Sequence, residues 1–109
     1  MLHRDLAAGR WWTMTLAEQI ANAGADVGRA ISAKAVGDEG RARRALDRAL
    51  ELIDLTLADP RRTWPQLKEL ARMREIVCDY LVGDNAYGST SEWIDSYFTQ
   101  FALASRRDR

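Results

Sequence analysis

Apolar residues recur along this chain at spacings of three and four, in four separate stretches. That spacing places them on one face of an α-helix and predicts helices at about 15–36, 38–58, 64–82 and 90–106. The expected core residues are Leu16, Ile20, Val27 and Ile31; Leu46, Leu50, Ile53 and Leu57; Leu67, Leu70, Val77 and Leu81; and Trp93, Ile94, Tyr97, Phe98 and Phe101. The pattern therefore indicates an all-α fold.

Polar residues at the ends of the stretches agree with these bounds. A Ser or Thr followed three residues later by Glu or Gln is typical of a capping box, in which each side chain accepts a hydrogen bond from the other residue's amide. The predicted N-terminal caps are Thr15 with Glu18, Thr63 with Gln66, Ser89 with Glu92, and Asp38 alone. The predicted helix ends are Gly37, Asp59–Pro60 and Gly83.

Short connections between amphipathic helices favour antiparallel neighbours. We therefore expect one domain over 15–109, an up-down antiparallel four-helix bundle, preceded by an N-terminal extension over 1–14. The Trp11–Trp12 pair of that extension is expected to pack on the bundle or, alternatively, on a partner. A stripe of small residues on the first helix would let another backbone approach closely: Ala17, Ala21, Gly24 and Gly28.

Composition narrows the possible functions. The 109 residues contain 16 basic and 16 acidic side chains, so no net charge draws the protein to nucleic acid or a membrane. The single cysteine, Cys78, excludes an internal disulfide and a cysteine-based zinc site, and the single histidine, His3, disfavours a histidine relay. We expect no metal and no cofactor. The lack of a disulfide fits the reducing conditions of a cytoplasmic protein. No apolar stretch is long enough for a signal peptide or membrane span.

Arg74 is the most unusual charged residue because a helical wheel places it in the middle of an apolar arc. An arginine there needs a carboxylate, since unpaired burial of a charge is costly. Asp54 on the preceding helix is the natural partner, which predicts a structural pair of Asp54 and Arg74. Alternatively, Arg74 faces a polar groove or a dimer cleft and binds an anion.

Further candidate binding residues follow Arg74 along the chain. Asp79 and Tyr80 end the same helix, and the turn after it carries Asp84, Asn85 and Tyr87. Either these residues line a binding site together with Arg74, or they form a solvated helix face and a well-capped loop.

A second apolar set lies off the predicted core stripes. Its members are Leu52, Leu55, Met73, Ile76 and Tyr80. A monomeric bundle would expose them, so they predict a homodimer interface. Alternatively, the N-terminal extension covers some of them.

The stretch from Leu70 to Tyr80, followed by Gly83-Asp84, resembles a helix of the HEPN superfamily. These proteins are small helical bundles of prokaryotic toxin–antitoxin and nucleotidyltransferase-associated systems, often with an Arg-x-x-x-x-His motif. Arg74 matches the arginine, whereas Asp79 stands at the histidine position. Active members of this superfamily cleave RNA without metal, using Arg and His across a dimer cleft, and the resemblance implies a related fold and dimer cleft here.

Because Asp79 replaces that histidine, we expect a non-catalytic relative. The expected function is a binding module that forms a homodimer and pairs with a nucleotidyltransferase-type protein, with nucleotide or RNA as a further ligand in the dimer cleft. One alternative is an RNase or nucleotide-processing enzyme that uses Arg74 and Asp79. Another is a purely structural helical adaptor.

Overall fold

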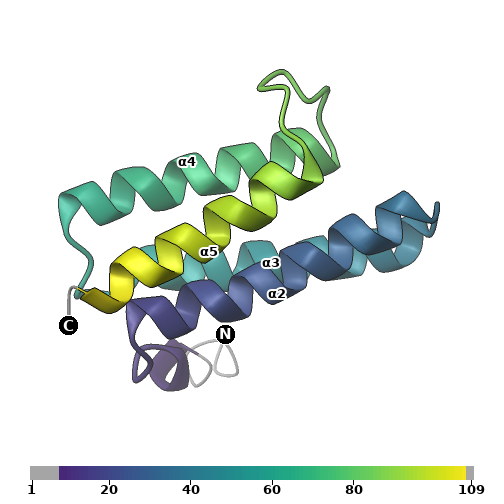
Figure 1. The fold of residues 1–109 in the computed structure, drawn as a ribbon. Coiled ribbons are helices and arrows are strands. Elements are labelled where there is room, and N and C mark those ends of the chain that lie inside the picture. The colour runs from purple at the N-terminus through teal and green to yellow at the C-terminus, as the bar shows by residue number, and fades with distance from the viewer. Residues whose placement is uncertain (1–7, 108–109) are drawn as a thin grey trace.

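The computed structural model describes residues 8–107, which contain helices and loops but no strand. A single helical turn at 8–11 precedes four long helices (Figure 1). These are α2 (Leu16–Ala35), α3 (Glu39–Leu57), α4 (Trp64–Leu81) and α5 (Ser91–Arg107). The prediction of an all-α fold is therefore confirmed, and the helix ends lie within one residue of the predicted bounds.

Local capping explains where the helices begin. Thr15 and Thr63 each form the predicted capping box, and the Asp38 side chain accepts a hydrogen bond from the Arg41 amide. The predicted box at Ser89 is wrong. The Asn85 side chain holds both the amide and the carbonyl of Ser89, which belongs to the loop, and Thr90 caps α5 by accepting a hydrogen bond from the Trp93 amide.

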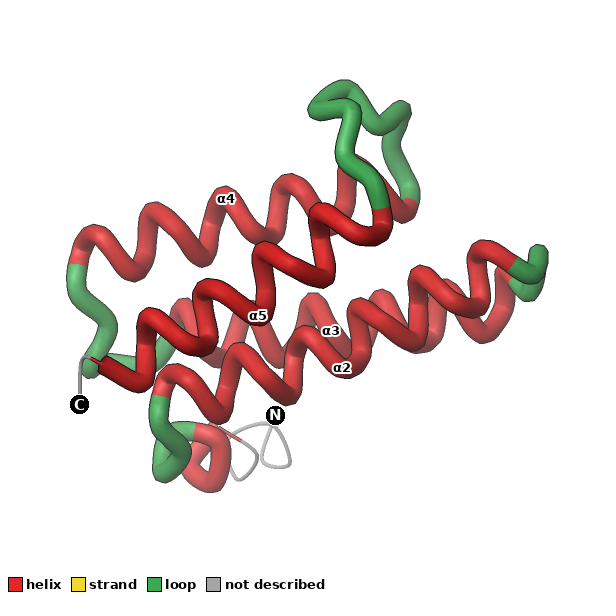
Figure 2. The backbone as a smooth tube through the Cα atoms, in the orientation of Figure 1, coloured by secondary structure: helices red, strands yellow, loops and turns green. Residues whose placement is uncertain are grey.

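The connections alternate between the two ends of the molecule. Figure 2 shows the loops after α2 and α4 at one end and the loop after α3 at the other. α2 packs most closely against α3 and α5, whereas α4 contacts mainly α3. The chain is thus a helical bundle in which α2 is shared by two neighbours.

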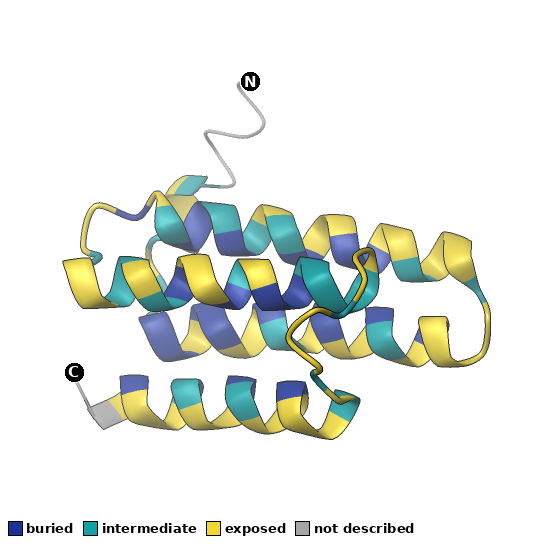
Figure 3. Cartoon of the chain, turned by 90° about the horizontal axis from the view of Figure 1, so that it is seen from above, coloured by how far each residue is buried: buried dark blue, intermediate teal, exposed yellow. Residues whose placement is uncertain are grey.

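The helices bury the sides that face one another, as the view from above shows (Figure 3). The core unites residues from all four helices, including Ile20, Ile53, Ile76 and Ile94. Trp93, predicted to be a core residue, instead lies 46% exposed and stacks on Tyr97 with 5.2 Å between ring centroids.

Residues of the N-terminal extension pack on the C-terminal end of α3. The Trp11 side chain is only 7% exposed and donates a hydrogen bond from Nε1 to Thr56 Oγ1 at 2.9 Å. The Trp12 Nε1 donates to the Leu55 carbonyl at 2.8 Å. Of the two placements open to the tryptophan pair, contact with the bundle is the observed one.

Two glycines of α2 have different surroundings. A Cβ atom at Gly24 would lie 3.0 Å from Phe98 Cδ1, so the absence of a side chain lets α5 approach α2. A Cβ atom at Gly28 would meet nothing within 4 Å. Packing within this chain therefore explains Gly24 but leaves Gly28 unexplained.

The helices over 8–107 do not match membrane-spanning segments. None of them combines the length and the apolar character needed to cross a bilayer.

Candidate functional site

Arg74 pairs with Asp54 across α3 and α4. Its Nε lies 2.8 Å from Asp54 Oδ1, and a second guanidinium nitrogen lies 3.3 Å from Oδ2. This bidentate geometry raises the pKa of the Arg74 guanidinium, chiefly through the hydrogen bond with Asp54. The side chains are 41% and 40% exposed, so the expected position in the middle of the apolar arc is wrong. Arg74 lies at the edge of the buried face of α4.

Asp79 fastens the α4–α5 loop to the end of α4. Its Oδ1 accepts a hydrogen bond from the Ala86 amide at 2.7 Å, and its Oδ2 accepts one from the Tyr87 amide at 3.1 Å. The Asp79 carbonyl accepts a third from the Asn85 amide. Both carboxylate oxygens are thus used to hold the backbone of the loop.

The candidate residues Asn85 and Tyr87 of the loop are held by Ser89 and by side chains of α4. Asn85 has a positive φ of 52°, and its side-chain amide binds both backbone groups of Ser89. The Tyr87 hydroxyl donates to Glu75 Oε2 at 3.1 Å, and this hydrogen bond raises the pKa of Tyr87. Asp84 is exposed. These contacts describe a well-ordered turn.

Arg74 and Asp79 therefore do not share a site. The Arg74 guanidinium is held by α3, whereas the Asp79 carboxylate is held by the loop that follows α4. Tyr80 is half-buried, and Lys34 Nζ lies 5.0 Å from the centroid of its ring.

The apolar set expected at a dimer interface is not an exposed surface. Leu55, Met73 and Ile76 are buried, and Leu52 and Tyr80 are partly buried against the core. Core contacts cover a wider arc of α4 than its main stripe, and Trp12 reaches the backbone of Leu55. The residues chosen from the sequence thus lend no support to a dimer.

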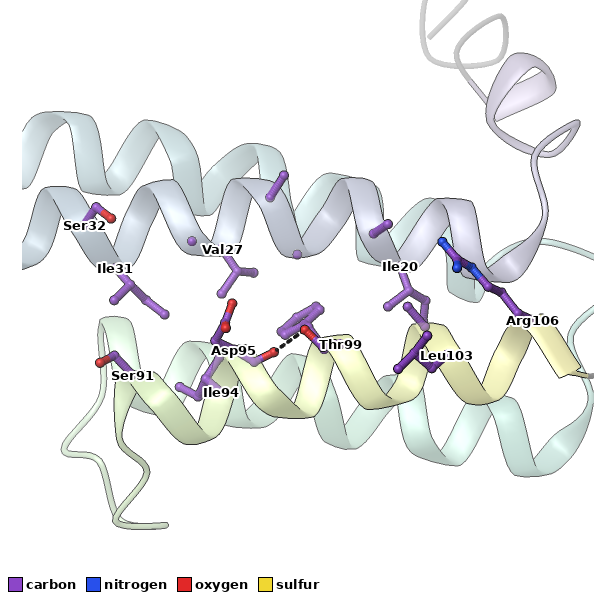
Figure 4. Close-up of a pocket in the computed structure, with 16 residues that line it drawn as sticks. Ile20, Val27, Ile31, Ser32, Ser91, Ile94, Asp95, Thr99, Leu103 and Arg106 are labelled. Carbon is purple, nitrogen blue, oxygen red and sulfur yellow. Dashed lines mark hydrogen bonds between the residues drawn. The ribbon is translucent and has the colours of Figure 1, made fainter.

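An open groove runs between α2 and α5. It measures about 580 Å³ and is mainly apolar. Figure 4 shows its walls: Ile20, Val27 and Ile31 come from α2, whereas Ile94, Asp95, Thr99, Leu103 and Arg106 come from α5. The small-residue stripe of α2 was the signal for close packing, but it did not predict that part of the stripe stays open.

A buried polar cluster around Asp59 was also missed. The Asp59 side chain is fully buried and binds Arg61 Nη2 at 2.6 Å and Gln19 Nε2 at 3.1 Å, with Arg62 Nη2 at 3.6 Å. Burial alone would raise its pKa, but the hydrogen bonds from Arg61 and Gln19 and the charge of Arg62 lower it to about 2. Gln19 also binds the Trp11 carbonyl, so the cluster joins the N-terminal extension to the α3–α4 connection.

The described residues offer no evident metal centre. Within 8–107, no three His, Cys, Asp or Glu side chains lie together in a way that could hold an ion. His3 lies outside the described residues.

Comparison with known proteins adds no relative. No protein-family model, no curated protein and no solved structure matches the chain.

Proposed function

We propose that this chain is a non-catalytic helical interaction module that binds a helix of a protein partner in the α2–α5 groove. The observation that carries the proposal is the groove itself, an open and mainly apolar cavity of about 580 Å³ along two helices. Open apolar surface of this kind is typical of an interaction site.

The shape of the α2 wall favours a helical ligand. Its open residues are Ala21, Ala25, Gly28 and Ser32, which follow one another at spacings of four, three and four. That spacing is the heptad pattern by which one helix packs along another. Because all four side chains are small, a docked helix would approach the α2 backbone closely.

The contacts of Arg74 and Asp79 support a non-catalytic role. Asp54 binds the Arg74 guanidinium, and the loop amides occupy the Asp79 carboxylate, so both groups already have partners within the chain. Arg106 is the one arginine in the lining of the groove. RNA or a nucleotide needs several basic side chains to bind its phosphates, so this lining does not suit those ligands. A protein helix suits the groove better than either of those ligands.

The HEPN-like resemblance is part of this proposal. It adds a nucleotidyltransferase-type protein as one candidate partner. The short connections add an up-down arrangement of the four helices, and the single cysteine adds a cytoplasmic location. Arg74 and Asp54 bind each other, which suits a purely structural helical adaptor equally well. Binding of a partner at the groove would distinguish an interaction module from such an adaptor.

Site-specific photo-crosslinking in cells tests the proposal. A photoreactive amino acid replaces Leu103 at the rim of the groove or, as a control, Trp64 at the start of α4, which is 71% exposed. We expect a crosslinked protein, identified by mass spectrometry, from position 103 and not from position 64. Absence of any crosslink at position 103 contradicts an interaction site in the groove.

A further inference from the structure

We infer that the partner in the groove is a second copy of this chain, related to the first by a twofold axis that crosses α5 near Thr99. The inference rests on the proposed function and names its partner. Three observations support it: the charges of the groove, its shape, and the open space at Gly28.

The groove carries one acidic and one basic side chain, so the grooves of two copies can be complementary in charge. Asp95 and Arg106 line its α5 wall about three helical turns apart, roughly 16 Å along the axis. Within the described residues, neither side chain takes part in an ion pair. A twofold axis that crosses α5 at Thr99 sets two α5 helices antiparallel. Arg106 of each copy then lies at a level about 4.5 Å along the helix axis from Asp95 of the other, which is within reach of an arginine side chain.

The shape of the groove is complementary in the same register. Leu103 is 49% exposed and lies on one side of Thr99, and Asp95 lies at an equal distance on the other. Figure 4 places Asp95 beside Val27, the residue before Gly28. The same axis therefore carries Leu103 of each copy to the level of Gly28 of the other, where space for a side chain is open.

This arrangement explains why position 28 is a glycine, whereas packing within the single chain does not. A glycine inside a helix is unfavourable relative to alanine. Contact with Phe98 explains Gly24, but nothing lies within 4 Å of a Cβ atom at Gly28. A leucine from a second copy would occupy that space.

A second copy fits the groove better than an unrelated helix of one charge sign. An acidic helix would repel Asp95, and a basic helix would repel Arg106. A second copy presents one group of each sign in the required order, and each contact occurs twice because the interface is symmetric.

Sedimentation equilibrium of the purified full chain, from about 1 to about 200 µM, tests the inference. We expect twice the chain mass for the wild type. Asp95→Arg or Arg106→Asp alone should raise the dimer dissociation constant at least about tenfold, and the two together should restore it to within about threefold. Glu51→Arg, the same charge change at an exposed position of α3, should leave it unchanged.

Gly28→Leu is the steric test. The new side chain meets open space in the single chain, so the variant should remain folded by circular dichroism while its dimer dissociates at least about tenfold more readily. A monomeric wild type over the whole range overturns the inference. A dimer that withstands Gly28→Leu and both single charge reversals also overturns it.

The crosslink at position 103 separates failure of this inference from failure of the proposed function. A crosslink between two copies supports both. A crosslink to a different protein, with a monomeric purified chain, overturns the second copy and leaves the interaction module standing. A monomer without any crosslink overturns both.

Discussion

The ion pair of Arg74 and Asp54 is partly exposed to solvent. Each side chain is about two-fifths exposed, so solvent screens their attraction and both charges keep part of their hydration. We expect Arg74→Ala to lower the free energy of unfolding by about 1 kcal/mol or less. Chemical denaturation measures the change. A loss of about 3–5 kcal/mol, the size typical of a broken buried pair, would contradict this account.

Asp59 forms a buried ion pair, in contrast to the partly exposed pair of Arg74 and Asp54. Its side chain has no exposed surface, and the side chain of Arg62 beside it is only 5% exposed. Asp59→Ala leaves a buried guanidinium without its carboxylate and the Gln19 amide without one acceptor. We expect a loss of about 3 kcal/mol or more in chemical denaturation. Asp47→Ala is a suitable control, since that carboxylate belongs to an exposed i,i+4 pair with Arg43 and should matter little.

The same carboxylate predicts how stability depends on pH. The folded-state pKa of Asp59 is about 2, below the 3.8 of an aspartate in an unfolded chain, so the folded state binds its proton less readily than the unfolded chain. The stability that Asp59 contributes is therefore complete above pH 3.8 and is lost as the pH falls toward 2. Acid titration of the unfolding free energy should show this loss in the wild type and a shallower slope in Asp59→Asn. Equal slopes would contradict the assignment.

At the scale of single helices, the two glycines of α2 separate close packing from open surface. Gly28→Ala should stabilise the single chain by about 0.5–1 kcal/mol, because alanine favours the helix and its Cβ meets nothing. Gly24→Ala should gain less or destabilise, because its Cβ would press on the buried Phe98 ring at 3.0 Å. Thermal unfolding of both variants, measured at a concentration where the chain is monomeric, compares them. A larger gain at Gly24 would contradict the packing described.

Helix ends could be predicted from the sequence because their causes are local. The capping boxes at Thr15 and Thr63 each join residues three apart, so the sequence alone contains both partners. The capping box predicted at Ser89 does not form because the side chain of Asn85, four residues earlier, binds the backbone groups of Ser89. A capping pattern next to a turn-forming asparagine is therefore a weaker signal than one that follows an open loop.

The faces of α4 could not be predicted in the same way. Met73 and Ile76 lie off the main stripe of α4, and the periodicity gives no sign of how wide an arc the neighbouring helices cover. The Asp59 cluster was missed for a related reason, because Gln19 joins it from 40 residues away. Arg74 and Asp54 were predicted as partners because Arg74 interrupts the apolar arc of α4 and Asp54 lies near the edge of the core stripe of α3.

At the scale of the whole molecule, the groups that chemistry would need are used to hold the fold. The Arg74 guanidinium ties α4 to α3, and the Asp79 carboxylate ties α4 to the loop before α5. The groove between α2 and α5 is open and its lining is mainly apolar. This distribution of polar and apolar groups supports the proposed interaction module.

We therefore expect that the purified protein does not cleave single-stranded or structured RNA in the absence of metal. Proton transfer needs a group free to reach the substrate, and both oxygens of Asp79 already accept hydrogen bonds from the amides of Ala86 and Tyr87. Incubation with labelled RNA in a chelator, resolved by gel electrophoresis, measures cleavage. Asp84→Ala is the matched control, because Asp84 is an exposed aspartate of the same segment. Cleavage that persists in Asp84→Ala and disappears in Asp79→Ala would show that the Asp79 carboxylate leaves the loop to act on substrate, and the chain would then be an enzyme.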